Sequence, residues 1–128
     1  MPHFILEYSA NLDEEIAIPE LFRKLHEAAI DTGVYPIGGI RSRAIRCDQF
    51  RIADGDPDQG FVHLIAKIGH GRDAETKKAT SQRFFAVLTE HLDPIFQKRY
   101  LGISFEMMES PPEPELSYKK NNIHSRFK

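Results

Sequence analysis

The second residue of the chain is a proline that leads directly into a strand-like run, Met1-Pro2-His3-Phe4-Ile5. Methionine is usually removed when a small residue such as proline follows it, so the mature chain would begin with the secondary amine of Pro2. An ordinary α-amino group titrates near ~8, and burial or nearby cations lower an amine's pKa. An amine that titrates close to neutral pH suits proton-transfer catalysis. Pro2 is therefore a candidate general base, and an incidental Met-Pro start without a chemical role is the alternative.

Arginines provide the second part of this chemistry, and four of them lie in one short stretch: Arg41, Arg43, Arg46 and Arg51. Because side chains alternate along a strand, Arg41 and Arg43 are expected on one face. A guanidinium beside a sheet core is costly unless it meets an anion. In a chain of net charge −2, the cluster indicates a discrete anionic ligand rather than nucleic acid. A solvated face with scattered salt bridges is the alternative.

Arg72 follows Gly69-His70-Gly71 and precedes an expected helix, where backbone amides and the helix dipole also favour an anion. A terminal amine surrounded by arginines suits a small acid with several carboxylates. The arginines would bind the carboxylates, lower the amine's pKa and stabilise an enolate as the amine moves a proton between oxygen and carbon. His63 and His70 are expected in structural or surface roles, so no metal site is predicted.

The elements that must position these groups come from an internal repeat. At a spacing of 60 residues, the following identities recur: His3 with His63, Ile5 with Ile65, Asp13 with Asp73, and Glu15 with Glu75. The order strand, turn, helix, strand also recurs, which is typical of duplication. We expect one domain spanning 1–128, with repeats at about 2–52 and 61–109, a polar linker at Ala53–Gly60 and a C-terminal arm at 110–128.

Two such β-α-β units predict an α+β fold, a four-stranded sheet with two helices on one face in a ferredoxin-like arrangement. The other sheet face would be bare, and a second protomer is the simplest cover for it. In the repeat, Pro2 corresponds to Val62 and Arg72 to Leu12. Each copy thus keeps one of the two functional groups, which predicts one composite site rather than two.

In the first copy we expect a strand at Phe4–Ser9, an acidic helix start at Asp13–Glu15, Pro19 in the first turn, a helix stop at Gly33 and a strand at Ile40–Cys47. In the second we expect a strand at Phe61–Ile68, a helix capped by Asp73 and ended or kinked by Pro94, and a strand at Ile103–Glu109. The helix residues expected to face the core are Leu21, Phe22, Leu25, Ala28, Ala29, Phe84, Phe85, Leu88 and Leu92.

Composition limits the setting. The chain has 128 residues, 41% of them hydrophobic, and no apolar stretch approaches the ~18 residues of a membrane span. No signal-peptide pattern opens the sequence. Cys47 is the only cysteine, which excludes an internal disulfide and favours a cytoplasmic location without membrane partners.

At these residues the chain resembles the tautomerase superfamily, and within it the 5-carboxymethyl-2-hydroxymuconate isomerases of homoprotocatechuate (4-hydroxyphenylacetate) degradation. The resemblance covers nearly the whole chain. It rests on Met1-Pro2-His3-Phe4-Ile5, Gly38-Gly39-Ile40-Arg41-Ser42-Arg43, Ala53-Asp54-Gly55, Phe61-Val62-His63, Lys67-Ile68-Gly69 with Gly71-Arg72, Ser104-Phe105-Glu106, and Asn121-Asn122 with His124 and Phe127-Lys128.

The resemblance implies a tautomerase fold, a homotrimer, and an isomerase that interconverts keto and enol groups without a cofactor. It implies Pro2 as general base and proton shuttle, with Arg72 and Arg41 as catalytic and substrate-binding arginines. Arg43 joins the binding set because it shares a face with Arg41. An aromatic residue that shorter relatives place beside the proline is not assigned.

The implied reaction is ketonisation of 5-carboxymethyl-2-hydroxymuconate, a dienol with three carboxylates, to the conjugated 2-oxo acid. A phenylpyruvate-type tautomerase, which would act on substrates with fewer carboxylates, is one alternative. A non-catalytic ferredoxin-like assembly module is the other.

Overall fold

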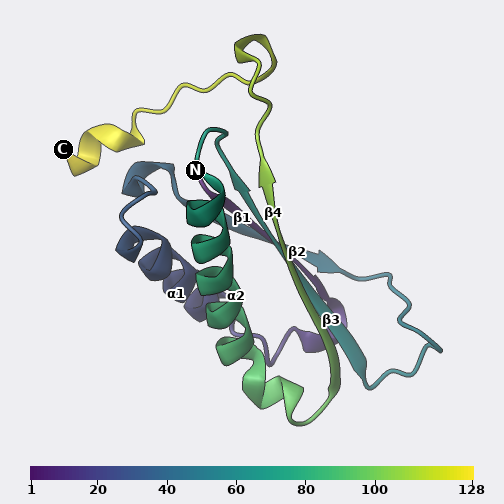
Figure 1. Ribbon diagram of the computed structural model, residues 1–128. Helices are drawn as coiled ribbons and strands as arrows, with labels where there is room; N and C mark the ends of the chain where they lie inside the picture. The colour runs from purple at the N-terminus through teal and green to yellow at the C-terminus, as the bar shows by residue number, and fades with distance from the viewer.

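The computed structural model describes residues 1–128. The first β-α-β unit comprises β1 (His3–Ser9), α1 (Ile18–Asp31) and β2 (Arg41–Cys47), and the second comprises β3 (Gln59–Ile68), α2 (Ala74–Phe96) and β4 (Tyr100–Glu109). The sheet order is β2-β1-β3-β4. Strands pair in parallel within each unit, and β1 pairs antiparallel with β3 between units. Both helices cover the same face of the sheet (Figure 1), which confirms the expected α+β fold.

Alternation along the two central strands creates the core. In β1 the side chains of Phe4, Leu6 and Tyr8 are buried against the helices, because successive residues of a strand point to opposite faces. On α2, Phe84 and Leu88 are fully buried, as expected from the helical stripe. Phe85 is 40% exposed, so its expected place in the core is wrong; it lies about 100° around the helix from Phe84.

The helix starts differ from the sequence expectation in one case. The acidic turn Asp13–Glu15 does not begin a helix; a short 3-10 segment at Ala10–Leu12 precedes it, and α1 starts only at Ile18. Pro19 does lie in the first turn of α1, where its missing N–H has no helical partner to lose. In α2, Asp73 caps the helix as expected, accepting a 2.8 Å hydrogen bond from the Thr76 amide.

The second unit extends further than predicted at three points. Helix α2 continues two residues beyond Pro94, to Phe96, so Pro94 does not end it. β4 begins at Tyr100 rather than Ile103, because Gln59 pairs with Tyr100 and lengthens the ladder. For the same reason the last two residues of the expected linker, Gln59 and Gly60, belong to β3.

After β4 the chain crosses back over the end of the sheet where the N-terminus lies (Figure 1). We call residues 110–128 the C-terminal arm; it contains two 3-10 segments, η3 (Pro114–Leu116) and η4 (Ile123–Phe127). A third 3-10 segment, η2 (Ile37–Gly39), precedes β2, and η4 packs against it. Neither α1 nor α2 has the length and apolar character needed to span a membrane.

Candidate active site

Strand register brings Pro2 and Arg72 to the same end of the sheet. Pro2 is buried at the start of β1, and its carbonyl accepts a 3.1 Å hydrogen bond from the Arg41 amide. Because β1 and β3 are antiparallel, His3 pairs with Lys67 near the end of β3. The loop that follows β3 and carries Arg72 therefore returns beside the start of β1. The first copy of the repeat thus supplies Pro2 to this end of the sheet, and the second copy supplies Arg72.

The corresponding positions at the opposite end of the sheet are filled by apolar packing. Val62 and Leu12, the repeat counterparts of Pro2 and Arg72, are both fully buried. A Cβ on Gly60 would lie 2.8 Å from the Leu12 side chain, so the leucine occupies the space beside the β3 backbone. No cationic cluster with a terminal amine exists there.

The terminal amine, carried by Met1 in this structure, lies in a cationic setting. Burial lowers its pKa from 8.0 to about 6, and the charges of Arg41, Lys119 and Arg72 add to the effect in that order. Burial favours the neutral form of an amine because the charged form loses hydration. The nitrogen of Pro2 is one residue away in the same setting.

The two arginines nearest the amine have no carboxylate partner. Arg41 makes only a long 3.5 Å contact with the Gly38 carbonyl. Arg72 donates to the Gly69 and Val34 carbonyls at 3.3 and 3.0 Å, and its guanidinium lies 4.5 Å from the centre of the Tyr35 ring. By contrast, the arginines that do pair with carboxylates are Arg23, Arg46, Arg83 and Arg99. The charges of Arg41 and Arg72 are thus available for an anionic ligand.

Arg43 shares the face of Arg41, as the strand period predicts, but the structure does not bring it to the amine. It pairs with Ile5 rather than with the start of β1, and its guanidinium lies 3.0 Å from Nδ1 of His3. Burial, followed by the charges of Arg43 and Arg41, lowers the pKa of His3. Arg43 therefore contacts His3 rather than the terminal amine.

Two cavities flank the amine. The first has a volume of about 340 Å³ and is lined in part by Arg41, and the second, of about 620 Å³, is lined in part by Arg72. Met1, Lys119 and His124 line both. Because Met1 contributes to the lining of both spaces, its removal would enlarge the room around Pro2. Their combined size is in the range of small-ligand sites.

Sequence reasoning missed the contribution of the C-terminal arm. Lys119 and His124 come to the amine from more than 110 residues along the chain, and Asn121 donates a 2.9 Å hydrogen bond to the Gly38 carbonyl. The only sequence signal for the arm was the Asn121-Asn122 and His124 motif, which indicated the family but not where the arm packs. Two aromatic residues also lie here, Tyr35 beneath Arg72 and the exposed Tyr118 in the first cavity.

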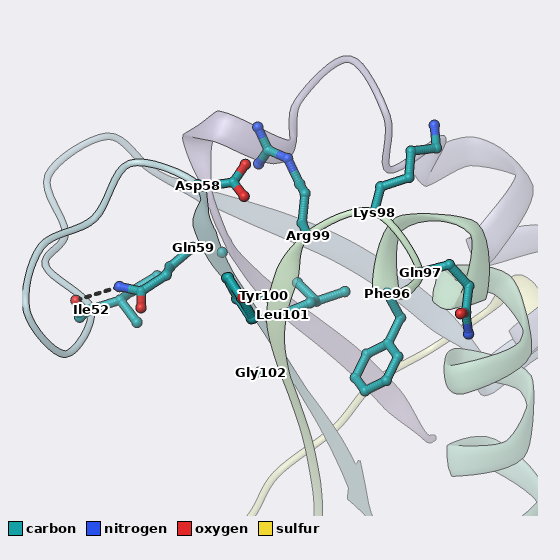
Figure 2. Close-up of a pocket in the computed structure, with 11 residues that line it drawn as sticks. Ile52, Asp58, Gln59, Phe96, Gln97, Lys98, Arg99, Tyr100, Leu101 and Gly102 are labelled. Atoms are coloured by element: carbon teal, nitrogen blue, oxygen red, sulfur yellow. Dashed lines mark hydrogen bonds between the residues drawn. The ribbon is translucent and has the colours of Figure 1, made fainter.

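A further large cavity, of about 650 Å³, lies at the opposite end of the sheet where β3 and β4 begin. Figure 2 shows its lining, including Arg99 and the hydrogen bond from Gln59 Nε2 to the Ile52 carbonyl. Arg99 is neutralised by Glu15 at 3.4 Å and donates to the Asn11 carbonyl. Lys98 also lines this cavity, but neither the terminal amine of the chain nor an arginine without a carboxylate partner does.

The histidines considered at the sequence level lie apart from each other. His63 contacts the Ser104 hydroxyl at 2.6 Å and Glu106 at 3.3 Å on the open sheet face, whereas His70 is exposed in the loop after β3. No three His, Cys, Asp or Glu side chains gather into a group that could hold a metal ion.

Comparison with known proteins gives consistent similarities. A sequence model of the family described as 5-carboxymethyl-2-hydroxymuconate isomerase matches residues 2–127. The chain is 40% identical over 128 residues to a 5-carboxymethyl-2-hydroxymuconate Delta-isomerase of Escherichia coli, with 100% of both chains covered. It is similar to the crystal structure of a 5-carboxymethyl-2-hydroxymuconate isomerase from Deinococcus radiodurans R1, with TM-score 0.91, 43% identity, and 99% and 94% of the two chains covered. A fused 4-OT shares the fold at TM-score 0.59 and 13% identity, covering 85% and 87%.

Proposed function

Since the chain belongs to the 5-carboxymethyl-2-hydroxymuconate isomerase family, we propose that it ketonises 5-carboxymethyl-2-hydroxymuconate with the Pro2 amine as general base. The observation that carries this proposal is the setting of the terminal amine: the half-buried amine of Met1, one residue from the Pro2 nitrogen, has its pKa lowered to about 6 beside two arginines without carboxylate partners. The base becomes available once Met1 is removed, because the Pro2 nitrogen is otherwise an amide.

The proposed reaction moves one proton. The neutral Pro2 amine takes the proton of the dienol hydroxyl, the oxygen becomes a carbonyl, and the electron pair shifts along the conjugated chain. The protonated amine then returns a proton to a distant carbon, giving the conjugated 2-oxo acid. The burial and the nearby cations that lower the pKa of the terminal amine of Met1 would also favour the neutral form of the Pro2 amine, in which it can accept a proton.

Arg41 and Arg72 would hold carboxylates of the substrate and stabilise the dienolate. Charge-assisted hydrogen bonds from guanidinium to carboxylate are about twice as strong as neutral ones. Fixed cations near a developing oxyanion lower the barrier without reorganising during the reaction. Arg43, turned toward His3, would contribute to the positive potential at this end of the sheet rather than contact the reacting group.

We also propose a homotrimer in the cytoplasm acting in homoprotocatechuate degradation. The open sheet face supports assembly because it carries apolar side chains: Ile5 faces Ile65 across β1 and β3, and Ile45 on β2 is 46% exposed. In a trimer, the corresponding faces of the other two copies would remove these side chains from water. Light scattering should give a mass near 44 kDa, three times the 14.7 kDa of one chain.

Turnover of the dienol by variants tests the catalytic proposal. Pro2→Ala should lower ketonisation by about a hundredfold or more, and Arg72→Ala by a similar factor. Arg51→Ala is a matched control, because Arg51 has no carboxylate partner and donates only to the Asp54 carbonyl in the loop after β2. Wild-type turnover by either Pro2→Ala or Arg72→Ala would contradict the proposal.

Two measurements decide between this function and the alternatives. A higher kcat/KM for a phenylpyruvate-type enol than for the tricarboxylate dienol would favour the phenylpyruvate-type tautomerase. An intact mass that retains Met1 would leave no free Pro2 amine and would favour a non-catalytic module.

A further inference from the structure

The C-terminal arm brings a third cation to the amine. Lys119 lines both cavities that flank the amine, together with His124 from the same arm. Its side chain is exposed and makes no ion pair or hydrogen bond within the chain. Its charge lowers the amine's pKa, ranking after burial and Arg41 and before Arg72. Lys119 therefore adds a third positive charge to those of the two arginines around the amine.

The arm that carries Lys119 is anchored two residues further along. Asn121 Nδ2 donates to the Gly38 carbonyl at 2.9 Å, and Asn121 Oδ1 accepts from the Ile123 amide at 2.8 Å as η4 begins. His124 then packs directly on Gly38, where an added Cβ would lie 2.8 Å from the His124 Cα. The arm can pack this closely because Gly38 has no side chain. The contact of Asn121 with Gly38 therefore holds the chain in place two residues from Lys119, beside the site.

We propose that Lys119 binds the third carboxylate of the substrate and that the C-terminal arm thereby selects tricarboxylates over dicarboxylates at the site proposed above. Arg41 and Arg72 can each hold one carboxylate, which leaves a third without a counter-ion. The ammonium of a lysine is a compact charge on a flexible stem, so it can follow a carboxylate on a flexible branch of the substrate. The inference rests on the proposed function for the identity of the substrate.

Ligand affinity tests Lys119 separately from catalysis. We would measure Kd values by calorimetry for propane-1,2,3-tricarboxylate and for glutarate, which has one carboxylate fewer, at about pH 8 and constant ionic strength. The wild-type protein should bind the tricarboxylate about tenfold more tightly or better. Lys119→Met should reduce this preference to about twofold or less, and Lys119→Arg should restore most of it. Asn121→Ala, which releases the anchor, should also reduce the preference.

Lys128→Met is the matched control, because it removes one lysine charge from the same arm at a position that lines neither cavity. It should keep the wild-type preference. Equal affinity of the wild-type protein for both ligands, or an unchanged preference in Lys119→Met, would overturn the role of Lys119. A wild-type protein that prefers the tricarboxylate but does not ketonise the dienol would refute the proposed function while supporting the binding role.

Discussion

Replacing Arg41 with methionine should shift the pH dependence of ketonisation upward. Among the charges near the amine, Arg41 lowers its pKa most, although burial is the larger cause. Methionine retains much of the side-chain volume, so burial of the amine should persist. Because burial outweighs Arg41, loss of this charge should remove only the smaller part of the lowering. The pKa of the amine in the variant should therefore be higher than in the wild-type protein and still lower than that of an exposed amine.

The sign and size of the effect follow from the base role. A general base accepts a proton only in its neutral form, so kcat/KM falls as the pH drops through the pKa of the free enzyme. At a pH well above the pKa the amine is neutral in both proteins, whereas at a pH below the pKa each rise of one unit in the pKa lowers the neutral fraction about tenfold. Arg41→Met should therefore lose more activity at the acidic end of the range than at the alkaline end, by up to about tenfold for a rise of one unit, beyond a pH-independent loss from weaker carboxylate binding.

The assay is the initial rate of ketonisation, followed by absorbance of the conjugated product from about pH 5 to 9. Arg51→Met provides the control for net charge, because Arg51 is not among the charges that act on the amine. An inflection that stays at the wild-type pH in Arg41→Met would refute the electrostatic reasoning. A shift of equal size in Arg51→Met would do the same, since it would show that overall charge rather than the local cation sets the pKa.

Three further predictions concern stability and assembly. Asp73→Ala should lower the urea midpoint at neutral pH, because it removes the cap on the Thr76 amide. The hydrogen bond from Thr76 lowers the pKa of Asp73, so the stability that the cap contributes is present above about pH 4 and is lost as the carboxyl group protonates at lower pH. Phe84→Ala should cost about 3–5 kcal/mol in chemical denaturation, whereas Phe85→Ala, at a 40% exposed position, should cost less than half as much; equal losses would contradict the helix orientation. Ile45→Asp should convert the proposed trimer to single chains in light scattering, and an unchanged mass would show that the open face is not the interface.

Local patterns predicted most of the fold, because the periodicity of a helix or strand depends only on residues that lie close together in the sequence. Alternation identified β1, and the spacing of Leu21 and Leu25 identified the buried side of α1. The failures lie where the local signal is ambiguous. Phe84 and Phe85 are equally apolar, and only packing decides which one faces the sheet. Similarly, pairing with β3 extends β4 back to Tyr100, and no turn residue in the sequence marks that start.

The residue types of the candidate site could be predicted from the sequence, and their arrangement could not. Residue types and the repeat were sufficient to single out Pro2, Arg41 and Arg72 and to predict one composite site. Arg43 has the right face, yet its distance from the amine depends on strand register, which places it beside His3. Lys119 carried no periodic or motif signal, because the place of the arm depends on the contact of Asn121 with Gly38, which lies 83 residues away along the chain.

The sequence by itself determined the kinds of group available: a terminal amine, a set of arginines and two copies of a β-α-β unit. Only the tertiary structure decided which of them meet. Antiparallel pairing of β1 with β3 brings the loop of one copy to the strand start of the other, and the Asn121 contact with Gly38 returns the arm to the same end. The physical reason is that electrostatic effects on an amine depend on distance in space and on exclusion of water, and neither is encoded by separation along the chain.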